Sequence, residues 1–492
     1  MELATELEAS LKEFATASSV EVRENGSRVA PLAGLSWEVR GAAAKPLLHL
    51  WSEQHNLTRR VLAITDHSDQ RLALAVERFG HTRPDRLEFV RTEFDRSARD
   101  LSREEFCQRL GRILAERFPD ETLESLMISP DLEHSLSGNY ARGILRNGTA
   151  HWAVLAVPDG ESPEATENSL TFALLWLDRA GHSCRRGFIT GLRLIVPKGA
   201  SRAAAHRSQT LNGKVNLELY ESDPTRETLE RIDPHSTGNL DTWLVPQRET
   251  QSLLDQACGA LEPILALGPK VITVHPVVAS HEVWLRFRGL AFARWDDGKV
   301  FFRAGDPREK LTAASRPALK RLLNDLEIHR HPLAADTRHA LYRAQPERWL
   351  ESIVREDVTR VDVALDPRFV YAQVFANTAG EHGILDLLAV TRTGRLAVLE
   401  LKATEHIHLP LQSAGYWLCV RRHLQQGDFP RYGYFAGIEL QPAPPLVYLV
   451  APALHFHPTT DVLLRYLSPE MDVVRVGLAE SWRRGLRVVM RQ

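Results

Sequence analysis

The sequence is poor in cysteine, and its four cysteines form no metal-binding or disulfide pattern. Cys107, Cys184, Cys258 and Cys419 lie far apart among 492 residues, and no C-x-x-C pair occurs. This spacing argues against the common zinc motifs and against a disulfide framework. A reducing compartment therefore suits the chain.

Long apolar runs and an excess of one charge are also missing. No run approaches the ~20 apolar residues that span a bilayer. The first residues, MELATELEASLKEF, lack the basic start and apolar centre of a signal peptide. We therefore expect a cytoplasmic protein with no membrane partner. The net charge of −2 argues against a wholly basic surface but allows a local basic groove. No G-x-x-x-x-G-K-[ST] occurs, which excludes a P-loop motor.

What is present suffices for several domains, because 492 residues exceed what one hydrophobic core supports. The order of apolar patterns predicts a multidomain α/β protein. We expect α+β regions over residues 1–100 and 201–340, a separate unit over residues 101–200, and an α/β sandwich over residues 341–492. The charged residues 82–100 read as a loop or a solvated edge, and residues 102–118 as an amphipathic helix. Residues 1–340 would recognise substrate, bind a protein partner or hold a second copy of the chain.

Charged residues interrupt two neighbouring apolar runs in the last region. Residues 383–416 read GILDLLAVTRTGRLAVLELKATEHIHLPLQSAGY, with Asp386 in the first run and Glu400 and Lys402 in the second. Strand alternation places Glu400 and Lys402 on one face, at the end of their strand. A hairpin through TRTG brings Asp386 toward Glu400. An E-x-K alone is common on exposed strands as a solvated pair, but these flanking runs are apolar on both faces.

Oxygen ligands at this strand end would suit Mg²⁺ or Mn²⁺. The carboxylates of Asp386 and Glu400, with the backbone carbonyl of Leu401, are hard ligands of the kind these ions prefer. A bound divalent ion lowers the pKa of a water and neutralises charge that builds on a phosphate. Lys402 would orient that water or help to deprotonate it.

At this point the sequence resembles a known group of enzymes. Asp386 and the following Glu400-Leu401-Lys402 resemble the two-part core of the PD-(D/E)xK nuclease superfamily, and the likeness covers about residues 345–450. Gln412 and Tyr416 resemble the Q-x-x-x-Y helix of its RecB-like branch. The resemblance implies a restriction-endonuclease-like α/β sandwich over residues 341–492, with the order helix, three strands, helix and strand.

The resemblance also implies roles for single residues. Asp386 and Glu400 would hold the metal, and Lys402 would serve the nucleophilic water. An acidic residue on the first helix would support the metal or the water, and Glu347 is our choice, with Glu351 one turn further on as its competitor. Gln412 and Tyr416 would position the site or the DNA backbone. Pro410 departs from the pattern, because it lies near the start of their helix.

A second, degenerate copy of the same fold is a further hypothesis. Gly143-Ile144-Leu145 repeats residues 383–385, Ala153-Val154-Leu155 repeats residues 397–399, and residues 170–177 echo residues 411–418. This alignment replaces Glu400 by Ala156, Lys402 by Pro158, Gln412 by Thr171 and Tyr416 by Leu175. Such a copy would be inactive and would serve DNA binding or assembly. A different strand order in the two segments would contradict it.

These observations predict a metal-dependent nuclease that hydrolyses phosphodiester bonds, in DNA before RNA, for repair or for defence against foreign DNA. The alternative is a non-catalytic nucleic-acid-binding or scaffold protein on a nuclease-like fold. The retention of Asp386, Glu400 and Lys402 together argues against that alternative. The histidine pair His406 and His408 has a spacing that zinc sites use, but no cysteine or acidic cluster accompanies it, so we expect solvated or hydrogen-bonded histidines near the phosphate.

Overall fold

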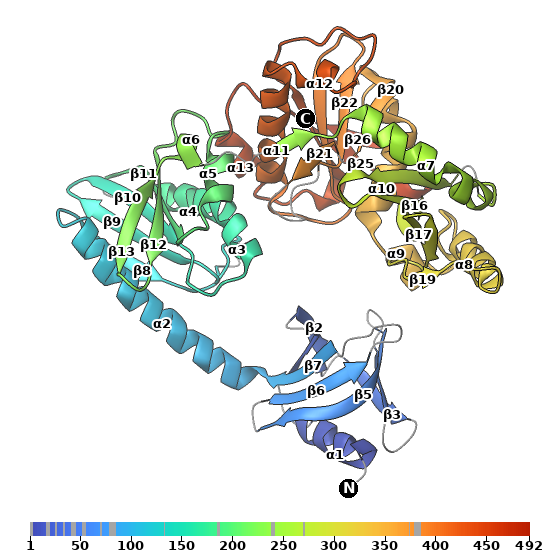
Figure 1. Cartoon of the computed structure of the whole chain (residues 1–492). Coiled ribbons are helices and arrows are strands. Elements are labelled where there is room, and N and C mark those ends of the chain that lie inside the picture. Colours follow the sequence, from blue (N-terminus) through green and yellow to red (C-terminus); the bar gives the residue numbers. More distant parts are fainter. Residues whose placement is uncertain are drawn as a thin grey trace. The chain divides into compact units, whose positions relative to one another are not determined.

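The structure, a computed structural model, is mixed α/β with several separate sheets (Figure 1). It describes residues 3–15, 20–24, 27–32, 35–40, 46–51, 56–68, 71–77, 85–131, 133–184, 187–237, 242–268, 271–372, 374–377 and 385–492. Contacts define two compact units, residues 1–106 and 107–492. Among the described residues, no helix is both long and apolar enough to cross a membrane.

The first unit is an antiparallel sheet with one helix packed against it. Leu7, Leu11 and Phe14 recur at helical spacing in α1 and enter the core of the sheet. The strand order is β2-β1-β7-β6-β5-β4-β3. The elements are α1 (Leu3–Ala15), β1 (Val20–Glu24), β2 (Ser27–Pro31), β3 (Ser36–Arg40), β4 (Leu47–Trp51), β5 (Asn56–His67), β6 (Arg71–Glu77) and β7 (Asp85–Arg91).

The loop or solvated edge expected over residues 82–100 is wrong for residues 85–100, because β7 lies between β1 and β6 and is not an edge strand. β7 occupies Asp85–Arg91, and α2 (Thr92–Arg117) follows it directly. The helix expected over residues 102–118 is therefore only the second half of a longer one. The first half, TEFDRSARDL, carries many charges and no apolar stripe, so hydrophobic periodicity gave no sign of it.

The second unit begins with a six-stranded mixed sheet in the order β13-β12-β11-β10-β9-β8. β8, β9 and β10 form an antiparallel meander, β10, β11 and β12 run parallel, and β13 is antiparallel. The unit expected over residues 101–200 extends further, because β12 and β13 of the same sheet lie beyond residue 200. β11 and β12 are parallel, and the crossover that joins parallel strands carries the chain past that residue. Its elements are β8 (Thr122–Met127), β9 (Ala141–Asn147), β10 (Ala150–Ala156), α3 (Pro163–Glu167), α4 (Ser169–Ser183), β11 (Phe188–Pro197), α5 (Arg202–Ser208), β12 (Leu217–Asp223), β13 (Thr228–Ile232) and α6 (Pro234–Thr237).

The last sheet of the chain has the same plan. Its order is β20-β22-β23-β24-β25-β26, with an antiparallel meander, two parallel steps and an antiparallel last strand. The strand order required by the repeat hypothesis is thus the same in both segments. The elements are α10 (Pro346–Glu356), β20 (Leu365–Tyr371), β22 (Leu387–Thr391), β23 (Leu396–Leu401), α11 (Leu409–Gln425), α12 (Asp428–Arg431), β24 (Leu446–Pro452), α13 (Thr460–Arg465), β25 (Asp472–Leu478) and β26 (Val488–Arg491).

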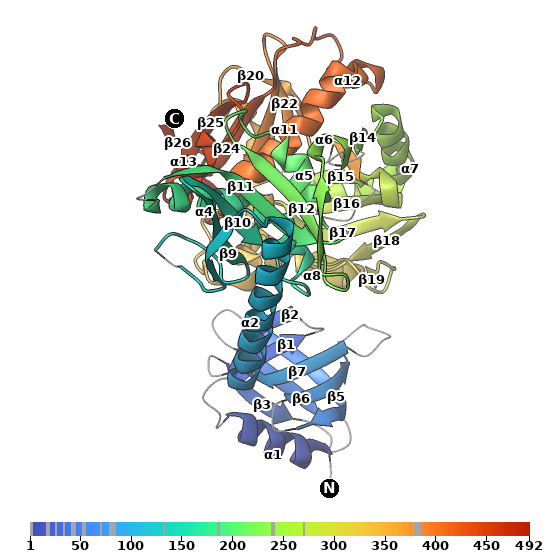
Figure 2. The same ribbon diagram turned by 90° about the vertical axis from the view of Figure 1, so that its left-hand side faces the viewer.

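The two sheets share one hydrophobic core through their helices. α11 contacts α5 and α13 contacts α4, so the helices of each sheet pack on those of the other (Figures 1 and 2). Leu211 after α5 and Leu467 after α13 face each other in an antiparallel bridge. The core contains Leu170 and Leu174 from α4 and Trp417 from α11. We call this arrangement the paired core.

A smaller α+β body lies in the chain between the two sheets. Its sheet is an antiparallel meander in the order β15-β16-β17-β18-β19, and Leu253, Ala257 and Leu261 of α7 pack on it. Asp297 and Gly298 both have positive φ, as a tight hairpin turn requires. The elements are β14 (Thr242–Leu244), which pairs with β21 (Phe375–Asn377), then α7 (Gln247–Leu265), β15 (Ile272–Val277), β16 (Glu282–Phe287), β17 (Leu290–Asp296), β18 (Lys299–Phe302), β19 (Glu309–Lys310), α8 (Arg316–His329) and α9 (Ala340–Arg343).

Candidate active site

The predicted carboxylates come together at the end of β23. β22 and β23 pair antiparallel with Leu387 opposite Leu399, so the same register places Asp386 opposite Glu400. The backbone N–H of Leu401 donates to Asp386 Oδ2 at 2.9 Å. Glu400 is only 2% exposed, in a strand whose other residues are all apolar and buried. Strand pairing therefore delivers two carboxylates to one partly enclosed place.

Lys402 lies against the same carboxylates. Its Nζ donates to Glu400 Oε1 at 3.0 Å. Burial alone would lower the pKa of Lys402, but the charges of Glu400 and Asp386 and this hydrogen bond raise it above its usual value. The side chain is thus a cation at neutral pH, which is suited to donate hydrogen bonds and not to accept a proton.

The two carboxylates have the electrostatics of a cation site. Burial raises the pKa of Asp386 well above its usual range, and the neighbouring charge of Glu400 raises it further. Burial also raises the pKa of Glu400, although Lys402 opposes this. Buried carboxylates that repel each other are relieved by a bound cation. Glu400 Oε2 is buried with no hydrogen-bond partner among the described residues, so it has a free lone pair for a ligand.

These observations fit a hard divalent ion held by Asp386 and Glu400. Within the described parts of the chain, no three side chains of the types His, Cys, Asp and Glu gather as a metal site. A two-carboxylate site completed by backbone carbonyl and water ligands is the arrangement that Mg²⁺ favours. The carbonyl of Leu401 as a third protein ligand stays a prediction.

Both candidate carboxylates of the first helix lie near the site, on different sides. Glu347 accepts a hydrogen bond from Thr404 Oγ1 at 3.3 Å, and its charge raises the pKa of Lys402. Glu351 is 2% exposed and its Oε1 has no partner among the described residues. Its charge helps to raise the pKa of Asp386. Glu347 thus serves the Lys402 side, and Glu351 serves the Asp386 side.

Arg348 joins Glu351 to Asp386, a link that the sequence did not indicate. Its Nη1 lies 2.5 Å from Glu351 Oε2 and 3.8 Å from Asp386 Oδ1. These contacts fix the position of Asp386 relative to α10. Arginines on helices are common, and nothing in the spacing of PERWLES distinguishes this one from a solvated residue.

Tyr416 of helix α11 lies close enough to Glu400 and Asp386 to feel their charges. Gln412 Oε1 is buried without a partner among the described residues. Burial raises the pKa of Tyr416, and the charges of Glu400 and Asp386 raise it further, so the hydroxyl stays a neutral hydrogen-bond donor. Pro410 falls in the first turn of α11, where no backbone N–H is needed, and the helix still begins at Leu409. Gly383 lies outside the described residues.

The two histidines after β23 are neutral. Burial lowers the pKa of His406 to about 4, and the charge of Lys402 adds to this effect. Burial lowers the pKa of His408 to about 3. His408 Nδ1 lies 3.0 Å from Thr171 Oγ1 on α4. His408 is therefore a hydrogen-bonded histidine, as expected, whereas His406 Nδ1 is buried without a partner among the described residues.

The described residues of the β8–β13 sheet carry no comparable set of charged residues at the matching positions. Val157 N–H donates to Ile195 O, and Lys402 N–H donates to Val450 O, each at 2.9 Å at the end of the third strand. This equates Lys402 with Val157 rather than with Pro158, and Glu400 with Leu155 rather than with Ala156. The one-residue correction has a physical basis, because a slip of one reverses the face of a strand. Leu155 and Val157 pack toward α4, as Glu400 points toward α11.

The corrected register also replaces the aspartate. Arg142 lies opposite Leu155, so it occupies the place of Asp386. It is 3% exposed, donates to Ser129 O, and its guanidinium lies 5.6 Å from the ring of Trp176. The GIL match at Gly143 is therefore out of register. A buried cation and two apolar residues stand where the second site has two carboxylates and a lysine, which leaves no metal ligands.

Comparison of the chain with protein-family models and with curated proteins found no match.

Proposed function

We propose that the second unit is a metal-dependent nuclease that hydrolyses phosphodiester bonds, with DNA as the first candidate substrate. The observation that supports it most is the half-buried Asp386 opposite the buried Glu400, with a partnerless Glu400 Oε2 among the described residues and the ammonium of Lys402 beside it. The resemblance of these residues to the PD-(D/E)xK core adds to this support. Glu347, Gln412 and Tyr416 are assigned to positioning the site or the substrate.

In this proposal each residue has one task. Asp386 and Glu400 would hold a Mg²⁺ or Mn²⁺ ion, which when bound acidifies water and neutralises phosphate charge. Lys402 donates a hydrogen bond to the attacking water or to a phosphate oxygen. The neutral hydroxyl of Tyr416 donates a hydrogen bond that positions the site or the substrate. A new P–O bond to the water oxygen forms as the P–O bond to the leaving nucleotide breaks. The water loses a proton and the leaving oxygen gains one.

The test is cleavage of supercoiled plasmid, single-stranded DNA and RNA by the full chain with Mg²⁺, Mn²⁺ or EDTA. We expect cutting that needs metal and falls by at least 10²-fold in Asp386→Ala and in Lys402→Ala. Glu356→Gln is the matched control, because Glu356 is an exposed carboxylate on the same helix as Glu347. If the Asp386→Ala, Lys402→Ala double variant cuts like the wild type, the site assignment is wrong.

A second readout separates the enzyme from its alternative. Titration with Mn²⁺ in a calorimeter should give one site per chain, lost in Asp386→Asn and in Glu400→Gln. Nucleic-acid binding without metal binding or cutting would instead favour a non-catalytic scaffold.

A further inference from the structure

Three arginines gather beside the Asp386 side of the site with one carboxylate between them. Arg348, Glu351 and Arg355 follow each other at helical spacing on one face of α10, opposite the apolar residues Trp349 and Leu350. The third arginine, Arg286, comes from β16 of the small α+β body. All three arginines are half-buried.

The α+β body is fixed to α10, so Arg286 is held in place. The turn after β16 contains Gly289, where an added Cβ would lie 2.0 Å from the backbone oxygen of Arg348. Arg330 is fully buried and donates to the backbone oxygens of Leu341 and Ala344 at 2.7 Å each, and to that of Arg288 at 3.1 Å. These contacts join the end of α8, the β16–β17 turn and the chain just before α10.

The arginine cluster has too few acidic partners. Within the described residues, no carboxylate lies within 4.0 Å of Arg286 or Arg355. Glu351 forms its ion pair with Arg348. The neighbour of Arg286 is His275, whose Nδ1 lies 3.5 Å from Arg286 Nη1. Burial and the three arginines lower the pKa of His275 well below its usual value, so His275 is neutral and adds no negative charge. Half-buried guanidinium groups without carboxylates suit a phosphate, which they bind in a planar, bidentate way.

We propose that Arg286 and Arg355, together with Arg348, form a binding subsite for a backbone phosphate of the nucleic acid next to the one that is cut. The proposal rests on the proposed function for its ligand class, a phosphodiester. Arg348 connects the subsite to the candidate metal site through its contacts with Glu351 and Asp386. The α+β body thereby gains a role in holding the substrate strand.

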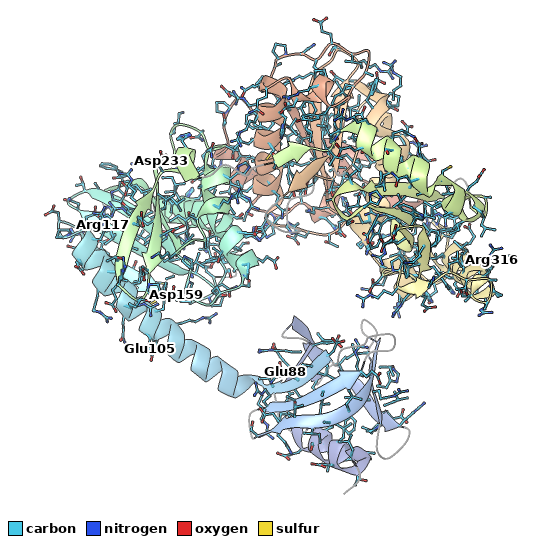
Figure 3. The ribbon with its side chains drawn as sticks, viewed as in Figure 1. Glu88, Glu105, Arg117, Asp159, Asp233 and Arg316 are labelled. Carbon is cyan, nitrogen blue, oxygen red and sulfur yellow. The ribbon has the colours of Figure 1, made fainter. Side chains whose placement is uncertain are left out.

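The experiment measures binding of a fluorescent 5′-hydroxyl oligonucleotide by anisotropy, in EDTA, over a series of salt concentrations. We expect Arg286→Ala and Arg355→Ala each to raise Kd by about 3–10-fold and to reduce the slope of log K against log salt by about 1. Arg316→Ala is the matched control, because Arg316 is exposed on α8 of the same body (Figure 3). It should leave both quantities unchanged.

Two further arms make the result decisive. A backbone subsite is supported if inorganic phosphate competes with the oligonucleotide and if the variants weaken binding of 5′-hydroxyl and 5′-phosphorylated oligonucleotides equally. It is overturned if the variants weaken only the binding of the 5′-phosphorylated oligonucleotide. Wild-type Kd and slope in an Arg355→Ala variant that keeps its thermal midpoint also overturn it, and Arg355→Gln replaces that variant if it does not fold. If the wild type binds nucleic acid in an arginine-dependent way but does not cut it, the proposed hydrolysis is refuted and the subsite stands. If the wild type cuts and both arginine variants bind as it does, the subsite is refuted and the hydrolysis stands.

Discussion

Asp386 shows how a candidate catalytic residue can cost stability. Its folded-state pKa is raised by burial and by the charge of Glu400. Such a group favours folding below its unfolded pKa, near 3.8, and this contribution is lost as the pH rises toward the folded pKa. At neutral pH and without metal, the burial and the charge of Glu400 that raise this pKa therefore disfavour the fold.

We accordingly expect Asp386→Asn to raise the thermal midpoint in EDTA at pH 7. The gain should be roughly 2–4 °C, the shift that about 1 kcal/mol gives in a medium-sized domain. Asparagine keeps an oxygen for the Leu401 N–H but loses the repulsion. Mn²⁺ should raise the midpoint of the wild type and not that of the variant. A lower midpoint in EDTA for Asp386→Asn, measured by calorimetry beside Glu356→Gln, would contradict this account.

The β22–β23 hairpin depends on a glycine that no other residue can replace without a large loss of stability. Gly394 has φ 91°, and an added Cβ would lie 2.0 Å from the backbone oxygen of Glu439. Gly394→Ala should lower the free energy of unfolding by about 2–4 kcal/mol, from left-handed strain and overpacking together. It should also reduce activity, because this turn sets the register of Asp386 against Glu400.

Gly427 provides the control for this prediction. It also has positive φ, 71°, but no atom lies within 4 Å of an added Cβ. Gly427→Ala should cost only about 1 kcal/mol in urea unfolding. Equal losses for the two variants would mean that the contact with Glu439 is unimportant.

The elements that carry the site could be predicted from the sequence, because each has a clear period and end signals. The helix that carries Glu347 forms over Pro346–Glu356, the strands beside Asp386 and Glu400 pair as a hairpin, and Gln412 and Tyr416 share one helix. The start of α2 could not be predicted, since it has no apolar stripe. The register of the repeat was wrong by one residue at Glu400, because matches of Ala, Val and Leu do not indicate which face a strand buries.

The arginine cluster was beyond prediction for a different reason. Arg286 and Arg355 lie 69 positions apart in the printed sequence, and only the docking of the α+β body on α10 brings them together. Long-range contacts of this kind leave no periodic signal in a single sequence.

At the scale of the second unit, the paired core means that neither sheet has a complete core alone. α11 is buried on almost every side, with Leu411, Trp417 and Val420 all at most 1% exposed. A fragment of residues 345–492 should therefore aggregate or stay partly unfolded, whereas residues 107–492 should give a cooperative unfolding transition. Size-exclusion chromatography and circular dichroism of the two fragments check this. A monomeric, folded short fragment would contradict it.

The presence of the candidate site on only one of the two similar sheets, among the described residues, has a consequence for duplex substrates. The β8–β13 sheet has Arg142, Leu155 and Val157 at the positions where the β20–β26 sheet has its charged residues. One chain would therefore cut one strand at a time. If the proposed function holds, supercoiled plasmid should accumulate as open circles before any linear form on an agarose gel. Linear product at the earliest times, at the lowest protein concentration, would speak against a single centre.

The paired core also bears on how the chain matures during synthesis. Helices α4 and α5 leave the ribosome well before α11 and α13, which follow about 200 to 290 residues later, or roughly 20–30 s at ~10 residues per second. Throughout that interval the apolar surfaces of Leu170 and Leu174 lack their final cover. The nascent chain is thus a candidate client for chaperones, and slow codons between the two sheets would lengthen its exposure to aggregation.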